Sequence, residues 1–208
     1  MNEIETEHSR CTRCGLPVVR CICDQIPSTS SNALFCLLLH EKEWQRETNT
    51  GHLIKALLPE TQLFTWQRNQ PDPELIQILQ APELSPYLIF PADRPELEPR
   101  QVAASSHCDS AVHRPLYLIL DGTWKEVRKI LRKSPYLDHL PLLSINSERS
   151  TNYQLRRNPD PTHLCTAEIA IELLQLESPI AEPEIAHSLS TTLTLFQHQY
   201  LRYKDRKA

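Results

Sequence analysis

The sequence contains very little glycine. Only Gly15, Gly51 and Gly122 occur among 208 residues, whereas glycine usually makes up about 7% of a protein. P-loops and the G-x-G-x-x-G fingerprint of dinucleotide sites each need closely spaced glycines. Both motifs are therefore absent, and a Rossmann-type nucleotide site with its usual fingerprint is disfavoured.

Long apolar runs and a secretory start are missing as well. No stretch approaches the roughly 18 apolar residues of a membrane-spanning helix. The start, MNEIETEHSR, is polar and acidic, whereas a signal peptide begins with basic and then apolar residues. Hydrophobic residues make up 40% and charged residues 23% of the chain, as in ordinary soluble enzymes. We expect a soluble, cytoplasmic protein with no membrane partner.

Cysteine, in contrast, is frequent and clustered. Four of the seven cysteines lie in CTRCGLPVVRCICD, with the spacing C-x2-C-x6-C-x-C. Disulfides are rare in the cytosol, and two close pairs of thiolates can converge on one tetrahedral Zn²⁺ in a closed, structural site. Free thiols, a redox C-x-x-C pair or an iron–sulfur cluster are less favoured. The predicted zinc ligands are Cys11, Cys14, Cys21 and Cys23.

The remaining chain alternates strand-length apolar runs with helical patterns. Strands are predicted at 33–40, 61–66, 85–91, 116–120 and 140–146, and helices at 51–58, 71–81, 123–133, 165–177 and 183–205. This order predicts an α/β fold with a mostly parallel sheet covered by helices. The polar stretch 92–114 is predicted to be an excursion loop. Residues 1–32 would form a tail and zinc knuckle, and residues 33–208 the main domain.

One predicted strand, LYLIL, runs directly into DGTW and a helix. Ligands of open α/β sheets bind beyond the carboxyl ends of strands, and Asp121 lies at such an end. Gly122 permits a sharp turn, Thr123 can cap the helix, and Trp124 offers a flat face for stacking. A helix cap followed by a core tryptophan is the plain alternative.

The helix that follows has one basic face. Its cations recur at helical spacing, with Glu126 as the one acid nearby. Such faces are usually solvated surface, but this one also fits a track for RNA phosphates, although the formal net charge of the chain is −4. The five cations are Lys125, Arg128, Lys129, Arg132 and Lys133.

Two further strand ends are rich in polar residues. HEKEWQRETNTG follows the first strand, and SERSTNYQLRRNPDPTHLCTAE follows the fifth. Because the carboxyl ends of parallel strands meet at one edge of a sheet, these segments and Asp121 should lie close together. Thr166 is well placed to cap the next helix, and Glu168 favours the positive end of that helix.

In this combination the sequence resembles the DTW-domain family, the tRNA-uridine aminocarboxypropyltransferases. The cysteine knuckle, HEKEWQRETNTG, LIFP, DGTW and YQLRRNPDPTHLCTAE occur in the family's order and approximate spacing over nearly the whole chain. The resemblance implies a SPOUT-like fold, with a knotted carboxyl-terminal half left open, and S-adenosylmethionine as co-substrate. It also implies transfer of the 3-amino-3-carboxypropyl group to N3 of a tRNA uridine, in the variable loop for the most similar bacterial members. The stretch 92–114 matches the family poorly.

Roles for the strand-end residues follow from this chemistry as expectations. Asp121 would act as general base on N3, beside Thr123, and Trp124 would stack on the uracil or adenine ring. The expected donor-binding residues are Phe90, Pro91, Leu120, Asp121, Gly122, Tyr153, Arg156, Thr166 and Glu168. The expected RNA-binding residues are His40, Glu43, Asn49, Thr50, Arg157 and the five cations of the basic helix. An RNA methyltransferase and a non-catalytic zinc-knuckle RNA-binding protein remain as alternatives; DNA is not an expected partner, and the oligomeric state is open.

Overall fold

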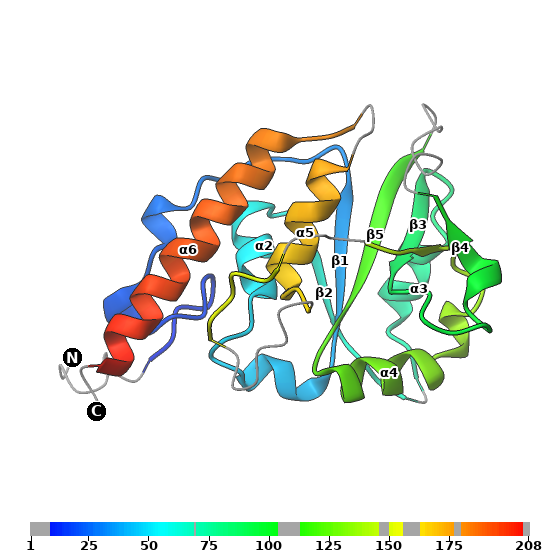
Figure 1. Cartoon of the computed structure of the whole chain (residues 1–208), viewed down its shortest axis with the longest axis horizontal. Helices are drawn as coiled ribbons and strands as arrows, with labels where there is room; N and C mark the ends of the chain where they lie inside the picture. Colours follow the sequence, from blue (N-terminus) through cyan, green and yellow to red (C-terminus); the bar gives the residue numbers. More distant parts are fainter. Residues whose placement is uncertain are drawn as a thin grey trace.

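The described residues form one six-stranded parallel sheet (Figure 1). The computed structural model describes residues 9–68, 70–103, 113–145, 150–155, 163–176 and 180–205. The strands are β1 (Leu34–Leu39), β2 (Gln62–Thr65), β3 (Leu84–Ile89), β4 (Gln101–Val102), β5 (Arg114–Asp121) and β6 (Leu142–Leu143). Their order across the sheet is β2-β1-β5-β3-β6-β4. The predicted α/β fold with a mostly parallel sheet is therefore confirmed, whereas the knot stays a prediction.

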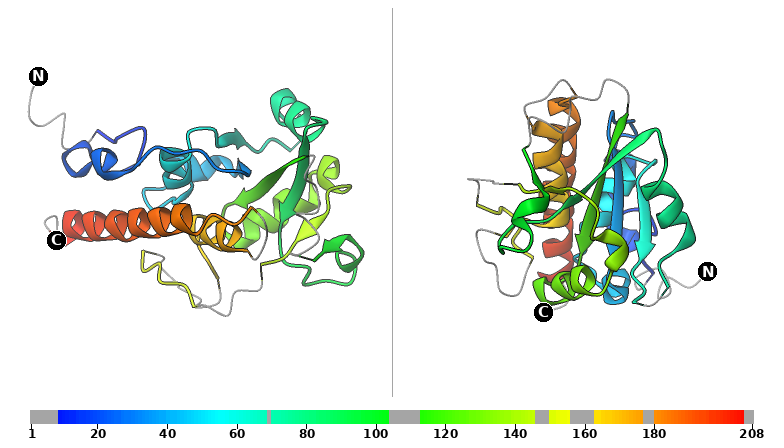
Figure 2. Two further views of the ribbon diagram at one scale, coloured as in Figure 1. Left: turned by 90° about the horizontal axis from the view of Figure 1, so that it is seen from above. Right: turned by 90° about the vertical axis from the view of Figure 1, so that its right-hand side faces the viewer.

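Helices cover both faces of this sheet. The α-helices are α2 (Gly51–Leu57), α3 (Pro73–Leu79), α4 (Trp124–Arg132), α5 (Thr166–Gln175) and α6 (Pro183–Asp205). The short 3-10 helices are η1 (Val18–Arg20), η2 (Cys23–Gln25), η3 (Glu41–Gln45), η4 (Glu98–Arg100) and η6 (Pro135–Leu137). Figure 2 shows α5 and α6 on one side of the sheet and α3 on the other. Within the described ranges, no helix is both long and apolar enough to cross a membrane.

The apolar run of β1 is explained by burial on both of its faces. Phe35 and Leu37 belong to the core shared with α2, α5 and α6. Cys36 and Leu38 belong to the second core, which contains residues of α3 and α4. Because successive side chains of a strand point to opposite faces, a strand between two helical layers needs an almost continuous apolar sequence.

The carboxyl ends of the central strands meet at one edge of the sheet. β5 lies between β1 and β3, with Asp121 opposite Leu39 and Ile119 opposite Ile89. The backbone N–H of His40 donates to the carbonyl of Asp121 at 2.9 Å, which extends the pairing by one residue. The segments that follow β1, β3 and β5 therefore begin side by side.

The prediction that 92–114 is only an excursion loop is wrong in part. The segment contributes η4 and the two-residue edge strand β4, and β5 begins already at Arg114. The Arg100 guanidinium donates to the carbonyls of Leu137 at 2.7 Å and Leu140 at 2.9 Å, which ties the segment to the sheet edge. A strand of two residues is too short to produce a periodic pattern, so the sequence does not reveal it.

The predicted strand at 140–146 is also much shorter than expected. Among residues 140–145, which the structure describes, Leu142–Leu143 alone pair, as β6. Beyond them the hydroxyl of Ser144 accepts from the backbone N–H of Ala92 at 3.0 Å and donates to the carbonyl of Phe90 at 3.2 Å. A side chain thus satisfies the backbone groups that a longer ladder would have paired.

Candidate active site and zinc centre

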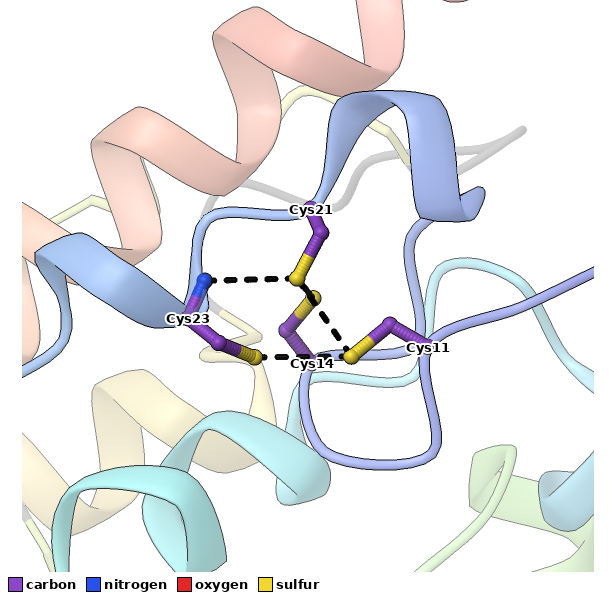
Figure 3. A group of neighbouring side chains, drawn as sticks. All are labelled: Cys11, Cys14, Cys21 and Cys23. Carbon is purple, nitrogen blue, oxygen red and sulfur yellow. Dashed lines mark hydrogen bonds between the residues drawn. The ribbon is translucent and has the colours of Figure 1, made fainter.

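The four clustered cysteines converge on one point (Figure 3). The Sγ atoms of Cys11 and Cys23 are 3.4 Å apart, those of Cys11 and Cys21 3.5 Å, and those of Cys14 and Cys21 3.9 Å. Four thiolates around Zn²⁺ at about 2.3 Å would have sulfur–sulfur distances of about 3.8 Å. The donor set and its spacing therefore fit one tetrahedral zinc ion with no open position.

The cysteine knuckle is packed against the main body of the chain. Gly15, which has a φ of 76°, forms the turn between Cys14 and Leu16. Cys14, Leu16 and Ile22 are buried in the same core as helices α2, α5 and α6. The guanidinium of Arg13 donates to the carbonyl of Ala56 at 2.7 Å. The knuckle thus contributes to the core, and the division at residue 32 stays a prediction.

Asp121 is the centre of a buried polar network at the strand ends. Its Oδ2 accepts from the side-chain amide of Asn49 at 2.9 Å, and its Oδ1 accepts from the hydroxyl of Thr166 at 3.0 Å. The residue is only 5% exposed. Burial raises the pKa of the Asp121 carboxyl above its ordinary value, although both hydrogen bonds oppose the shift. Asn49, Asp121 and Thr166, which lie at three predicted strand ends, thus meet in one network, whereas their roles stay predictions.

A second buried carboxylate shares the same amide. Asn49 Nδ2 also donates to Oε2 of Glu43 at 2.9 Å. Burial, followed by repulsion from Asp121, raises the pKa of Glu43 to about 7. Arg46 pairs with Glu43 and reaches Glu126 at 3.0 Å. One amide therefore bridges two carboxyl groups whose affinity for protons is raised.

The predicted helix cap at DGTW is present. Thr123 accepts from the backbone N–H of Glu126 at 3.4 Å, and the carboxylate of Glu126 accepts from the Thr123 N–H at 2.8 Å. Because Glu126 also binds Arg46, the start of α4 is tied to the polar network. Gly122 lies between this cap and Asp121.

Trp124 lies at the surface beside the end of β3. It is 37% exposed, and its ring centroid is 6.1 Å from that of Phe90 and 4.7 Å from that of His163. Arg128 lies over the ring at 5.9 Å. An exposed indole between two rings and a cation can stack on a nucleobase. Of the other expected donor-binding residues here, Leu120 is buried and Pro91 half-buried.

The predicted cap of α5 is wrong. Cys165 occupies the cap position, and Thr166 is the first helical residue, so its hydroxyl is directed to Asp121 instead. Glu168 accepts from the backbone N–H of Cys165 at 2.7 Å and from the hydroxyl of Thr151 at 2.7 Å. Glu168 therefore fixes the segment before Tyr153 to the start of α5.

The basic face of α4 is present on the surface. Lys125, Arg128, Lys129 and Arg132 are exposed and Lys133 is half-buried. Arg128 forms an ion pair with Asp93 at 3.2 Å, and Lys129 lies 5.3 Å from the centre of the Trp66 ring. The predicted exposure is confirmed, whereas contact with RNA stays a prediction.

Four residues expected to contact RNA lie inside the protein. His40, Glu43, Asn49 and Thr50 are all buried. Asn49 and Glu43 belong to the network, and the Thr50 hydroxyl accepts from the backbone N–H of Ala167 at 3.1 Å. This placement argues against direct contact with RNA. Arg156 and Arg157, also expected at the site, lie outside the described residues.

The DTW domain profile matches residues 8–201, almost the entire chain. The chain belongs to the DTW-domain family. Two curated relatives named tRNA-uridine aminocarboxypropyltransferase 2 are each 26% identical, one from Drosophila melanogaster over 202 residues and one from Macaca fascicularis over 186 residues. The alignments cover 92% and 83% of this chain, and 75% and 58% of the relatives. No solved structure matches the chain significantly.

Gly51 is required by the close packing of this DTW-family site. A Cβ at Gly51 would lie 2.9 Å from Asp121 Oδ2, 2.9 Å from Leu37 Cδ1 and 3.1 Å from Asn49 Oδ1. In helices alanine usually stabilises over glycine by up to about 1 kcal/mol. We expect Gly51→Ala instead to destabilise the protein by about 1–3 kcal/mol in urea titrations, because the atoms around the new methyl group must move apart.

The matched control for this substitution is Gly122→Ala. There the nearest side-chain atom to a new Cβ is Glu126 Cβ at 3.1 Å, and the next contacts are at 3.5 Å. We expect a smaller loss of stability than at Gly51. If the two substitutions lowered stability equally, the close approach of Gly51 to Asp121 would be contradicted.

Glu43 is expected to make stability decrease with pH. Its pKa is raised from 4.5 to about 7 on folding, so the folded state binds more protons than the unfolded state between these values. The free energy of unfolding should therefore fall as pH rises from about 4.5 to 7. We expect this decrease to be smaller in Glu43→Gln by on the order of 2 kcal/mol. Urea titrations at pH 5 and pH 8 measure it as the difference between the two free energies of unfolding. Glu41→Gln, at an exposed position of the same 3-10 helix, is the control, and the same pH dependence in both variants would refute the assignment.

Proposed function

We propose that this protein transfers the 3-amino-3-carboxypropyl group of S-adenosylmethionine to N3 of a tRNA uridine in the cytoplasm. The match to the DTW family across residues 8–201, with relatives named tRNA-uridine aminocarboxypropyltransferase 2, carries the proposal. The hydrogen bond between Asp121 and Thr166, and the exposed Trp124 that follows the same strand end, support it. We further propose that the target uridine lies in the variable loop.

The reaction requires that N3 lose its proton, because the imide of uridine is mostly protonated at neutral pH. In the proposed step the N3 electron pair attacks the γ-carbon of the methionine part of the donor. The bond from that carbon to the sulfonium breaks, its electron pair stays on sulfur, and methylthioadenosine leaves. The position of N3 relative to the γ-carbon, rather than to the methyl group, decides the reaction.

Asp121 is suited to receive the N3 proton. Burial raises its pKa, which increases its strength as a base. The carboxylate itself is covered, but the hydroxyl of the half-buried Thr166 lies 3.0 Å from Oδ1. We therefore propose that Thr166 accepts the proton from N3 while it gives its own proton to Asp121.

The other residues bind and position in this proposal. Trp124 and Phe90 border the space for the stacked ring, and Pro91, Leu120 and Gly122 belong to the strand ends that would hold the donor. Tyr153 donates to the carbonyl of Thr48, and with Glu168 it fixes the loops that frame the donor. Arg156 and Arg157 are proposed to bind the donor carboxylate or an RNA phosphate.

The remaining polar residues would either hold Asp121 in position or bind RNA. We assign His40, Glu43, Asn49 and Thr50, which are all buried, to the support of Asp121. Asn49 donates to both Asp121 and Glu43, and the backbone N–H of His40 donates to the carbonyl of Asp121. Thr50 contacts the helix that carries Thr166. The basic face of α4 would follow RNA phosphates. Zinc would stabilise the knuckle and take no part in the reaction.

The proposal is tested with unmodified tRNA and two labelled donors. One S-adenosylmethionine carries ¹³C in the aminocarboxypropyl carbons, and the other carries it in the methyl group. We expect mass spectrometry of digested tRNA to detect label from the first donor only, together with methylthioadenosine. Label from the methyl group with S-adenosylhomocysteine would identify a methyltransferase, and an unlabelled tRNA pool would refute transferase activity.

A further inference from the structure

A small cavity lies between the cysteine knuckle and the segment that follows β1. Its volume is about 160 Å³, and its lining includes Cys11, Thr12 and Gly15 of the knuckle as well as Trp44 and His52. Drug-sized pockets start at about 300 Å³, so this one suits a single ring system. The reaction proposed above does not use the space, although Asn49 forms part of its wall.

Trp44 gives the cavity a fixed aromatic wall. Its indole N–H donates to the hydroxyl of Thr65 at 2.8 Å, which holds the ring in place. The residue is nevertheless 42% exposed, unusually open for a tryptophan whose polar atom is already paired. The His52 ring lies 5.9 Å away, centre to centre, at an angle of 59°. Burial lowers the pKa of His52, which favours the neutral ring, and a neutral imidazole can accept a hydrogen bond.

Charged groups of both signs line the same cavity. Arg10 forms an ion pair with Glu47 at 2.7 Å, and Arg46 contributes a second guanidinium. Glu47 is also held by the Tyr200 hydroxyl at 3.0 Å. A simple anion would be repelled by Glu47, and an apolar ligand would leave these groups without water. A nucleobase offers a flat face together with donors and acceptors on its edge, which matches this lining.

The cavity is connected to the polar network of the reacting centre through Asn49 and Arg46. Asn49 lines the cavity and also donates to Asp121 Oδ2. Thr166 and Trp124, which would receive the reacting uridine, belong instead to α5 and α4, and Thr166 binds the other oxygen of Asp121. A ligand in the cavity would thus be a second nucleotide rather than the target.

We propose that this cavity binds one unpaired nucleotide of the tRNA, with its base stacked on Trp44 and its edge read by Arg10, Glu47 and His52. The inference rests on the proposed function in one respect, which is that the bound RNA is a tRNA. It gives the cysteine knuckle a direct part in RNA recognition, because Thr12 and Gly15 belong to the lining of the cavity.

The test compares Trp44→Leu with Trp44→Phe. Both substitutions keep an apolar side chain at an exposed position, but only phenylalanine keeps a π face. We expect Trp44→Leu to weaken binding of unmodified tRNA about tenfold, measured by filter binding without donor, and Trp44→Phe to lose about threefold or less. Val19→Leu, at an exposed position of the knuckle away from the cavity lining, is the control and should bind like the wild type. Equal affinities of Trp44→Leu and the control would overturn the inference.

Steady-state kinetics separate this inference from the proposed function. For Trp44→Leu, the KM for tRNA should rise about tenfold, whereas kcat and the Kd for S-adenosylmethionine should stay within about twofold of the wild type. If the wild-type protein forms no product but Trp44→Leu still loses tRNA affinity, the reaction is refuted and the nucleotide site stands. If transfer is normal and KM is unchanged, the nucleotide site is refuted alone.

Discussion

Asp121→Asn is expected to abolish transfer to tRNA while the protein stays folded. An amide can satisfy the same partners: its oxygen accepts from Asn49, and its NH₂ group donates to the Thr166 hydroxyl. The amide cannot take up the N3 proton, however. Since general base catalysis contributes about 10²–10⁴-fold, the rate of product formation should fall at least a hundredfold. Mass spectrometry of digested tRNA measures this rate, and calorimetry separates a loss of catalysis from a loss of donor binding, because Asp121 is also an expected donor-binding residue.

Two further variants make the Asp121 result interpretable. Asp138→Asn changes an exposed carboxylate outside the site and should keep full activity. Thr166→Val removes the proposed relay hydroxyl but leaves the Asp121 carboxylate. The variant should therefore lose activity, but its remaining rate should still depend on pH, whereas the rate of a variant without the base should not. If Asp121→Asn retains more than a third of the wild-type rate, Asp121 only positions its neighbours.

Much of the fold could be predicted because its signals are local. β1 and β5 are continuous apolar runs, and α6 was predicted at its observed bounds, 183–205. The cysteine cluster is equally local, because the four thiols of the short segment CTRCGLPVVRCICD must lie close together. In contrast, β4 and β6 contain two residues each, and pairs this short depend on long-range contacts rather than on a pattern.

The sequence predicted many residues of the site, but not their burial or their hydrogen-bond partners. Polar residues after parallel strands indicated a shared edge, and Asn49, Asp121 and Thr166 do meet there. The sequence could not separate buried from exposed members, so Glu43 and Asn49 were assigned to RNA. Arg46 was missed, although it lies inside HEKEWQRETNTG, because the burial of its nearby partner Glu43 and the approach of its distant partner Glu126 cannot be seen in the sequence.

Thr166 illustrates a different kind of error. A threonine before an apolar helical pattern normally caps the helix. Here the chain places Cys165 at the cap and directs the Thr166 hydroxyl to a buried carboxylate. Asp121 needs donors once it is buried, because a buried carboxylate without hydrogen bonds costs several kcal/mol. A tertiary requirement thus overrides the local preference.

Cys14→Ser is expected to remove the metal. It should lower the stability of the whole protein and not of the knuckle alone. The described part of the knuckle contains only η1, η2 and one isolated bridge, between Arg10 and Pro17. We therefore expect a bound metal to contribute to its shape, in addition to the packing of its buried residues. Cys14 is fully buried beside Leu16, in the core that includes α6. Structural zinc contributes about 10–16 kcal/mol in zinc-finger peptides, so even a fraction of this should lower Tm by at least about 10 °C.

The matched control is Cys36→Ser, which makes the same chemical change at a buried strand position in the other core. Metal analysis by mass spectrometry should find one zinc per chain in the wild type and in Cys36→Ser, and none in Cys14→Ser. Treating the wild type with a chelator should reproduce the lower Tm of Cys14→Ser, and adding zinc back should restore it. If the purified wild type contains no zinc, or if its Tm does not respond to the chelator, the four thiols are not a structural metal site. Since Thr12 and Gly15 line the same cavity as Trp44, loss of zinc should also weaken tRNA binding.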